Sequence, residues 1–250
     1  MEDMGRIPED PGDRREWLRA WATAQEQRAH EAQPGARRVR RALRRWLYQV
    51  LVRLNRAAYR MLDRGLDTAA HARSGEHDHA DRVYYVPTPW HVLPRALVAV
   101  RARRSDVLVD FGCGKGRILH QAARWPLRRV IGVEISPRLA EQASATLARH
   151  RDRYRCRDVE VVVADAASYR VPDDMTIGFF FDPFRGESMV AAMQRVVESL
   201  DRRPRRVRLI YVHPRDAGLV LATGRFRLVR ELRGGLRDVR VGRAAIFESV

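Results

Sequence analysis

"VDFGCGKGR", residues 109–117, places an acid and three closely spaced glycines where a short apolar run gives way to a helical pattern. An apolar run of this length, bounded by glycine, is typical of a buried strand. Glycines let the backbone turn tightly and leave room for a ligand to approach it. The stretch therefore predicts a strand, a ligand-binding loop and a helix, in that order.

The same alternation of strand and helix continues from about residue 83 to the C-terminus. Apolar runs predict five strands and weaker patterns predict two more, at 106–112, 129–136, 159–166, 176–184, 206–214, 226–229 and 244–248. Near-continuous apolar strands separated by helices indicate a parallel sheet that is covered on both faces. Right-handed crossovers make such a sheet doubly wound. We therefore predict an α/β domain over residues 83–250.

The residues before this domain have a different composition. Residues 1–36 are polar and charged, whereas 37–64 carry apolar residues at helical spacing among many arginines. We predict a basic helical extension over 1–82, partly disordered at its start, with a linker at 65–82. The basic helix could bind a membrane or nucleic acid, but packing on the domain is favoured. His77-Asp78-His79 offers too few ligands for a metal site, so none is predicted.

The composition limits the function classes. The formal net charge is +17, which favours an anionic partner, yet only Lys115 among the 48 basic residues is lysine. That skew is typical of codon bias and weakens the charge as evidence for a polyanion site. Cys113 and Cys156 lie far apart and predict thiols rather than a disulfide. We expect no secretory signal and no transmembrane segment, and therefore a cytoplasmic protein.

Acids stand at the ends of four predicted strands, at Asp110, Glu134, Asp165 and Asp182. Ligands of doubly wound sheets bind at these carboxyl ends. Asp110 would repel a pyrophosphate, and the loop is G-x-G-x-G rather than the G-x-G-x-x-G of dinucleotide-binding folds. It suits an ammonium group instead. Glu134 can accept both hydroxyls of a ribose. Asp165, with the backbone N–H of Ala166, can bind the amino group and a ring nitrogen of adenine.

These motifs together resemble a known family. "VDFGCGKGR", "VIGVEIS", "VVVADA" and "FFFDPF", in this order and spacing, are similar to the successive motifs of class I S-adenosylmethionine-dependent methyltransferases over roughly residues 83–250. The resemblance implies a doubly wound, seven-stranded, mostly parallel sheet and S-adenosylmethionine as cofactor. It implies the following cofactor-binding residues: Asp110, Gly112, Cys113, Gly114 and Gly116 at the methionine end, Glu134 and Ile135 at the ribose, and Asp165 and Ala166 at the adenine.

The fourth motif concerns the methyl acceptor. Family members that methylate amino groups carry an acidic or amide residue followed by Pro-Pro-aromatic, and the match here is Asp182-Pro183-Phe184, with a single proline. The resemblance implies that these three residues are catalytic, with Asp182 orienting an amine or accepting its proton. The missing proline argues against a planar nucleobase amine. It leaves a lysine, a small amine or another nucleophile.

The segment "YYVPTPW", residues 84–90, precedes the first predicted helix of the domain. Thr88-Pro89 predicts the N-cap and first position of that helix, and Pro94 predicts a kink or a later start. The resemblance implies a segment that closes the cofactor site here, with Tyr85 and Thr88 among its contacts. Packing of these aromatics onto the sheet is the alternative. The same region loosely resembles bacterial proteins similar to histone-lysine methyltransferases that lack a SET domain.

Two functions follow from the sequence. The first is a methyltransferase that acts on a nitrogen or oxygen nucleophile of a protein, an RNA or a small molecule, with a protein lysine among the candidates. The second is a catalytically inactive basic protein of the same fold that binds nucleic acid or an anionic membrane surface. Acids at all four strand ends favour the enzyme. The sequence does not predict the oligomeric state.

Overall fold

The computed structural model describes residues 87–182, 184–233 and 243–250, together with Trp17, Ala20, Leu66 and Thr68. The chain forms two compact units, Met1–Arg64 and Gly65–Val250, and the elements described below belong to the second. The predicted basic helix at 37–64 and the His77-Asp78-His79 cluster lie outside the described residues. Leu66 and Thr68, within the predicted linker, are buried. The division into domains at residue 82 stays a prediction.

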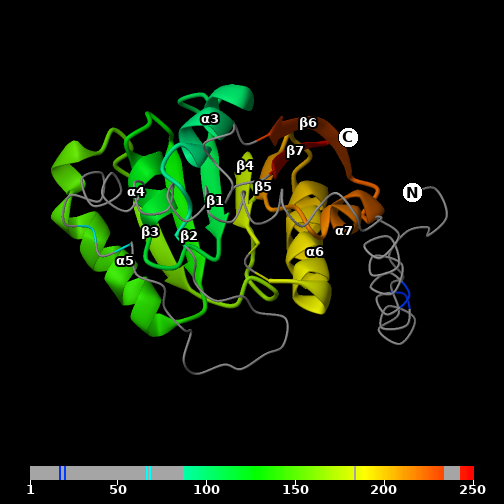
Figure 1. The fold of residues 1–250 in the computed structure, drawn as a ribbon, viewed down its shortest axis with the longest axis horizontal. Coiled ribbons are helices and arrows are strands. Elements are labelled where there is room, and N and C mark those ends of the chain that lie inside the picture. The colour runs from blue at the N-terminus through cyan, green and yellow to red at the C-terminus, as the bar shows by residue number, and fades with distance from the viewer. Residues whose placement is uncertain are drawn as a thin grey trace, which may run out of the picture. The chain divides into compact units, whose positions relative to one another are not determined.

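The second unit contains a seven-stranded sheet in the order β3-β2-β1-β4-β5-β7-β6 (Figure 1). β1 to β5 are parallel, and β7 is antiparallel to both of its neighbours. The predicted seven-stranded, mostly parallel α/β fold is therefore confirmed. The strands are β1 (Val107–Phe111), β2 (Arg129–Glu134), β3 (Val159–Val163), β4 (Ile177–Phe181), β5 (Arg208–Val212), β6 (Phe226–Arg233) and β7 (Arg243–Ser249).

Helices lie on both faces of this sheet. α3 and α4 pack in one apolar cluster with Ile177 and Phe179 of β4, whereas the ring of Phe180 stacks on Phe111 and contacts Tyr211. Figure 1 shows α4 and α5 beside β1 to β3, and α6 and α7 beside the other half of the sheet. The helical elements are α3 (Val92–Ala99), α4 (Arg117–Ala123), α5 (Pro137–Arg149), the short 3₁₀ helix η1 (Arg151–Arg153), α6 (Gly186–Arg202) and α7 (Ala217–Ala222). Among the described residues, no helix is both long and apolar enough to span a bilayer.

Two predicted helix starts had different outcomes. α5 begins as predicted, with Pro137 at its first position and the Ser136 side chain accepting the Leu139 N–H at 3.4 Å. The predicted start at Thr88-Pro89 is wrong, because α3 begins at Val92 with His91 as its N-cap. Pro94 explains the later start: proline has no N–H to donate, so it is tolerated in the first turn of a helix but not further along.

A buried ion pair joins three strands at the edge of the sheet where β1, β4 and β5 begin. Asp106 Oδ1 accepts from Arg208 Nη2 at 2.5 Å and from Thr176 Oγ1 at 2.8 Å. Its Oδ2 accepts the backbone N–H of Arg103 at 2.6 Å. Arg208 Nη1 also donates to the carbonyl of Val100 at 2.7 Å. These bonds tie the connection after α3 to the first residues of the sheet.

We expect Asp106→Ala to destabilise the protein strongly, because it leaves the buried Arg208 guanidinium without its carboxylate. Breaking a buried pair by removing one partner costs about 3–5 kcal/mol. Asp201→Ala is the matched control, since Asp201 pairs with Arg225 at the surface, where such a pair contributes about 0–1 kcal/mol. Urea unfolding of both variants measures the difference. Equal midpoints for the two would contradict a structural role for the Asp106 cluster.

Candidate functional site

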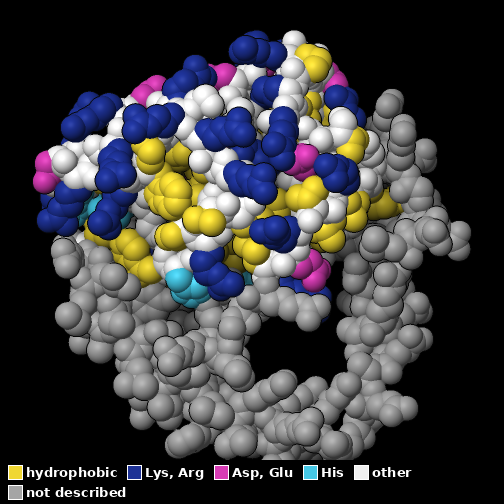
Figure 2. All heavy atoms as spheres, turned by 90° about the horizontal axis from the view of Figure 1, so that it is seen from above, with side chains coloured by type: hydrophobic (Ala, Val, Ile, Leu, Met, Phe, Trp, Pro, Cys, Tyr) yellow, Lys and Arg dark blue, Asp and Glu magenta, His cyan; other side chains and the backbone are white. Residues whose placement is uncertain are grey.

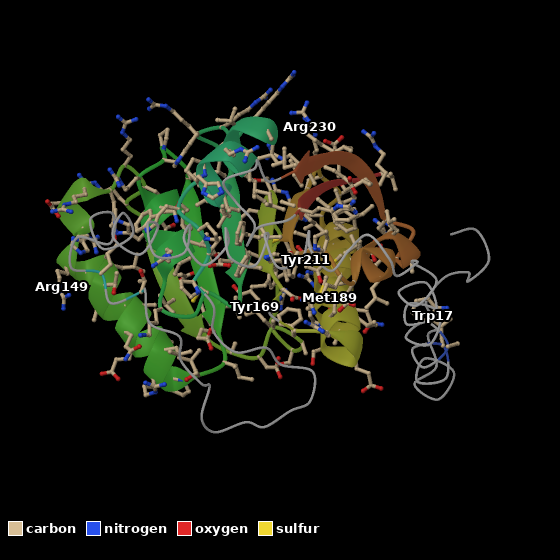
Figure 3. All side chains as sticks on the ribbon, viewed as in Figure 1. Trp17, Arg149, Tyr169, Met189, Tyr211 and Arg230 are labelled. Carbon is tan, nitrogen blue, oxygen red and sulfur yellow. The ribbon has the colours of Figure 1, made fainter. Side chains whose placement is uncertain are left out.

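Four acids lie at one edge of the sheet. Asp110 and Glu134 are in the last two residues of β1 and β2, Asp182 directly follows β4, and Asp165 follows β3 by two residues. Since β1 to β4 are parallel, these carboxyl ends meet at the same edge. In Figure 3, Met189 of α6 and Tyr211 of β5 mark this lower edge, opposite α3. Ligands of open α/β sheets bind at this position.

The glycine loop after β1 requires its glycines. Gly112, Gly114 and Gly116 have φ angles of 90°, 52° and 79°, which residues other than glycine rarely adopt. A Cβ on Gly116 would also lie 2.9 Å from the Cβ of Ala143 in α5. The loop therefore turns sharply and lets α4 and α5 pack closely.

The N–H groups of this loop are used within the protein. Gly112 and Cys113 both donate to the carbonyl of Val133, at 2.9 and 3.0 Å, and Gly116 donates to the carbonyl of Cys113 at 2.9 Å. Gly114 donates to Glu134 Oε2 at 2.8 Å. A phosphate-binding loop would instead direct several N–H groups at the ligand. The arrangement supports the interpretation that the loop does not hold a pyrophosphate.

Asp110 is the deepest of the four acids. Its side chain is 2% exposed, and its Oδ2 makes no hydrogen bond to any residue that the structure describes. Burial, and then the nearby charge of Glu134, raise the pKa of Asp110 well above its usual range. An ammonium group would satisfy the orphaned oxygen and offset both effects. The α-ammonium of S-adenosylmethionine fits this requirement.

Glu134 and Asp165 already accept backbone hydrogen bonds. Glu134 Oε1 accepts the Ser136 N–H at 2.9 Å, so each of its carboxylate oxygens accepts a backbone N–H. Asp165 is partly exposed, and its Oδ1 accepts the Ala167 N–H at 3.0 Å. Ala166 is buried and Ile135 partly exposed beside them. Ribose and adenine binding by these four residues stays a prediction.

A buried arginine, which the sequence analysis missed, ties the lead-in segment to the loop. Arg117 directly follows the last glycine, donates to Thr68 Oγ1 at 3.0 Å and to the Thr88 carbonyl at 3.1 Å, and lies 5.4 Å from the ring centroid of Trp90. Thr88 is therefore next to the glycine loop, but the bond uses its carbonyl. Tyr84 and Tyr85 lie outside the described residues. The signal in the sequence was an arginine directly after the last glycine, at the first position of α4.

The fourth motif ends β4 with an unusual backbone conformation. Asp182 has a φ of 44°, and His213, at the corresponding position after β5, has a φ of 52°. Non-glycine residues in this region are uncommon and gather at functional sites. Phe184 is buried, with its ring edge-on to Phe180 at 6.2 Å between centroids. Pro183 lies outside the described residues, and the catalytic roles predicted for all three residues stay predictions.

Residues 108–203 match a family described as "Methyltransferase domain". This segment carries a methyltransferase domain. It includes the glycine loop and all four strand-end acids, so the family match and the orphaned Asp110 oxygen agree on S-adenosylmethionine as the cofactor.

A protein-lysine N-methyltransferase of Saccharolobus islandicus is 36% identical over 69 residues, which is 27% of this chain and 43% of that protein. The chain thus spans less than half of that relative. Two solved structures are similar at lower identity. A precorrin-8w decarboxylase of Methanobacterium thermoautotrophicum is 19% identical, covering 66% of this chain and 92% of its own, with a TM-score of 0.49. An RNA methyltransferase of Salinibacter ruber is 21% identical, covering 66% and 92%, with a TM-score of 0.44.

We expect Asp110→Asn to stabilise the ligand-free protein while weakening cofactor binding. Because the folded-state pKa of Asp110 is raised, its contribution opposes folding increasingly as the pH rises from the unfolded pKa through the folded pKa. Asparagine removes that cost, so the melting temperature at pH 7.5 should rise by about 2–6 °C. Without its carboxylate partner the ammonium is held less tightly, so the calorimetric Kd for S-adenosylmethionine should rise about tenfold or more. An unchanged Kd would exclude Asp110 from the cofactor site.

Proposed function

We propose that this chain transfers a methyl group from S-adenosylmethionine to an amine nitrogen, with the side chain of a protein lysine as the acceptor. The observation that carries the proposal is the position of Asp182. It ends β4 in a left-handed conformation, at the same edge of the sheet as Asp110, Glu134 and Asp165. The name of the Saccharolobus islandicus relative supports lysine as the acceptor.

The residues at this edge divide the work of binding the cofactor. Asp110 would hold the α-ammonium, Glu134 the ribose hydroxyls, and Asp165 with Ala166 the adenine. The bound cofactor supplies a methyl group that is already activated by its sulfonium, so the protein contributes position and electrostatics. Burial raises the pKa of the Cys113 thiol, which keeps it protonated and argues against a nucleophilic role for the one cysteine in this loop.

Asp182 would hold the acceptor nitrogen in line with the methyl group. Two guanidinium groups approach its Oδ2, Arg185 Nη2 at 3.3 Å and Arg215 Nε at 3.6 Å. Its Oδ1 is buried, and the described part of the chain supplies it with no partner. That oxygen is available to accept an N–H of the acceptor. Because the Phe184 ring packs on Phe180, a planar base would lack the stacking partner that the full motif provides.

Asp182→Asn and Asp182→Ala should abolish turnover and leave cofactor affinity nearly unchanged. Asparagine tolerates the left-handed backbone, so it tests the charge without adding strain. With methyl-labelled S-adenosylmethionine, label should enter poly-L-lysine and not polyadenylate RNA. Both variants should lower that rate about 100-fold or more, the usual size of an acid–base contribution. A large drop in cofactor affinity would make the role of Asp182 structural, and label in the RNA alone would overturn the amine of a lysine as acceptor.

The charge distribution favours a second, compatible function, which is binding of RNA at the opposite edge. The connections that lead into β1, β2, β3 and β5 carry exposed arginines, and Figure 2 shows basic side chains spread over this face with few acids among them. We call this set the Arg-rich edge; it comprises Arg103, Arg104, Arg128, Arg155, Arg157, Arg203 and Arg206. The acids of the cofactor site lie at the other edge of the sheet, although Arg128 and Arg206 of the Arg-rich edge pair with Asp174 and Glu248.

Charge reversal at this edge should weaken RNA binding without changing cofactor affinity. Arg103→Glu with Arg104→Glu should lower the affinity for polyadenylate and reduce the slope of log K against log salt by about 0.7 for each phosphate of the single strand that the protein no longer neutralises. Arg138→Glu, on the exposed side of α5, is the control. Fluorescence anisotropy at several salt concentrations measures both quantities. An affinity that does not depend on salt would exclude the second function.

A further inference from the structure

Four buried polar atoms gather where β4 and β5 end. Asp182 Oδ1, Arg185 Nε and Asp216 Oδ2 each lack a hydrogen-bond partner among residues 87–182, 184–233 and 243–250, and Tyr211 Oη has at most a poorly aligned backbone N–H of Asp216. Buried polar groups in folded proteins are normally partnered, so several such atoms in one place need an explanation. Tyr211 and Asp216 are 0% and 4% exposed. The β5 residue Tyr211 is labelled in Figure 3.

These side chains are close enough to influence one another's ionisation. Burial raises the pKa of Tyr211, and the charges of Asp216 and Asp182 raise it further. Burial raises the pKa of Asp216 and the charge of Asp182 raises it further, whereas Arg185 and the backbone N–H of Gly186 lower it. The strand pairing explains why these side chains are close. Phe181 of β4 lies opposite Val212 of β5, so both segments leave the sheet at the next residue. The four side chains therefore form one cluster from strand β5 and the connections β4–α6 and β5–α7.

The two arginines beside Asp182 approach only one of its carboxylate oxygens. Arg185 and Arg215 both approach Oδ2 of Asp182, which offsets its charge on that side. Oδ1 of Asp182 and Oδ2 of Asp216 are able to accept hydrogen bonds, and Oη of Tyr211 can accept one beside the backbone N–H of Asp216. A primary alkylammonium group has three N–H donors, whereas the amino group of a nucleobase has two and is planar. The number and type of acceptors match the alkylammonium.

We propose that Asp182, Tyr211 and Asp216 bind the acceptor as a primary alkylamine of the lysine type, and that Asp216 takes up the proton that this amine must lose. The proposal rests on methyl transfer to an amine and adds two residues to it, Tyr211 and Asp216. The exposed side chain of Arg215 lies over Asp182 and would have to move aside when the acceptor enters.

The step balances in protons and electrons. The alkylammonium gives one proton to the Asp216 carboxylate and becomes a neutral amine with a free lone pair. That lone pair forms the new C–N bond, the C–S bond of S-adenosylmethionine breaks, and the sulfur keeps its electron pair as S-adenosylhomocysteine. The methylated ammonium carries the positive charge that the sulfonium had. Asp216 then passes its proton to water.

The charge state of Asp216 gives the step a pH dependence. Burial raises the pKa of Asp216 to about 6, and the groups that face it are Asp182 and Arg185 from one connection, Tyr211 from β5, and Arg215 beside it. Above this pH Asp216 is a carboxylate and can take the proton; below it the site is blocked. Methyl transfer should therefore fall as the pH drops through about 6.

Methylation of poly-L-lysine by the full chain, followed from pH 5 to 8, tests the assignment. Asp216→Asn should lower kcat about tenfold or more and remove the fall in rate at acid pH, which is the acid limb of the pH profile. Asp216→Glu should restore part of kcat and part of this acid limb. Tyr211→Phe should raise KM severalfold with a smaller effect on kcat. His213→Asn is the control for the pH limb, because histidine is the other side chain of this connection that ordinarily titrates near neutral pH and asparagine tolerates its left-handed backbone. Asp201→Asn is the control for removal of an exposed acid.

The possible results separate this proposal from the proposed function. An unchanged Kd for S-adenosylmethionine shows that each variant is folded. If the wild type methylates poly-L-lysine and Asp216→Asn keeps its kcat and acid limb, the role of Asp216 is overturned while methyl transfer to lysine stands. If His213→Asn removes the limb, the limb belongs to His213 and the assignment to Asp216 fails. If the wild type binds the cofactor but does not label poly-L-lysine, both the lysine acceptor and this cluster as its site fail.

Discussion

The repulsion between two buried carboxylates constrains this end of the molecule. Asp110 and Glu134 end neighbouring parallel strands, and the Glu134 charge adds to the burial that raises the pKa of Asp110. The glycine loop offsets part of this cost by giving Glu134 the N–H of Gly114. The bond from Gly114 to Glu134 needs left-handed backbone at three glycines. This sharp loop also sets where α4 begins. The remaining cost falls on Asp110, which is the group that an ammonium would satisfy.

The same edge holds a second group of acids, whose neighbours carry different charges. Asp182 and Asp216 lie near two arginines, whereas no arginine contributes to the shifted pKa of Asp110. In the first pair, Asp110 is suited to hold an ammonium group that keeps its charge. The second is suited to a cation that must shed a proton, because the arginines keep the cluster near neutrality. Two carboxylate pairs on one edge can thus serve different steps because their basic neighbours differ.

The sequence predicted the residues whose position follows from strand ends. Asp110, Glu134 and Asp182 were placed correctly because each closes an apolar run, and parallel pairing brings such ends together. The sequence could not predict that Tyr211 and Asp216 lie near Asp182. In the sequence, Tyr211 is indistinguishable from the other apolar residues of its strand. The helix α7 that follows Asp216 is too short to show helical periodicity. The start of α3 was wrong because the Thr88-Pro89 signal and the Pro94 signal competed, and the need to keep proline in the first turn decided between them.

The bond between Arg117 and Thr68 has a consequence for where the folded unit begins. Arg117 is 3% exposed, and Thr68, fully buried, lies 49 residues before it in the chain. A chain shortened to start at residue 83 would keep every strand and every predicted cofactor ligand, yet it would leave a buried guanidinium without one of its acceptors beside the glycine loop. Removing a hydrogen-bond acceptor from a buried charged group is costly. Thr68 is therefore expected to stabilise the compact unit that begins at Gly65.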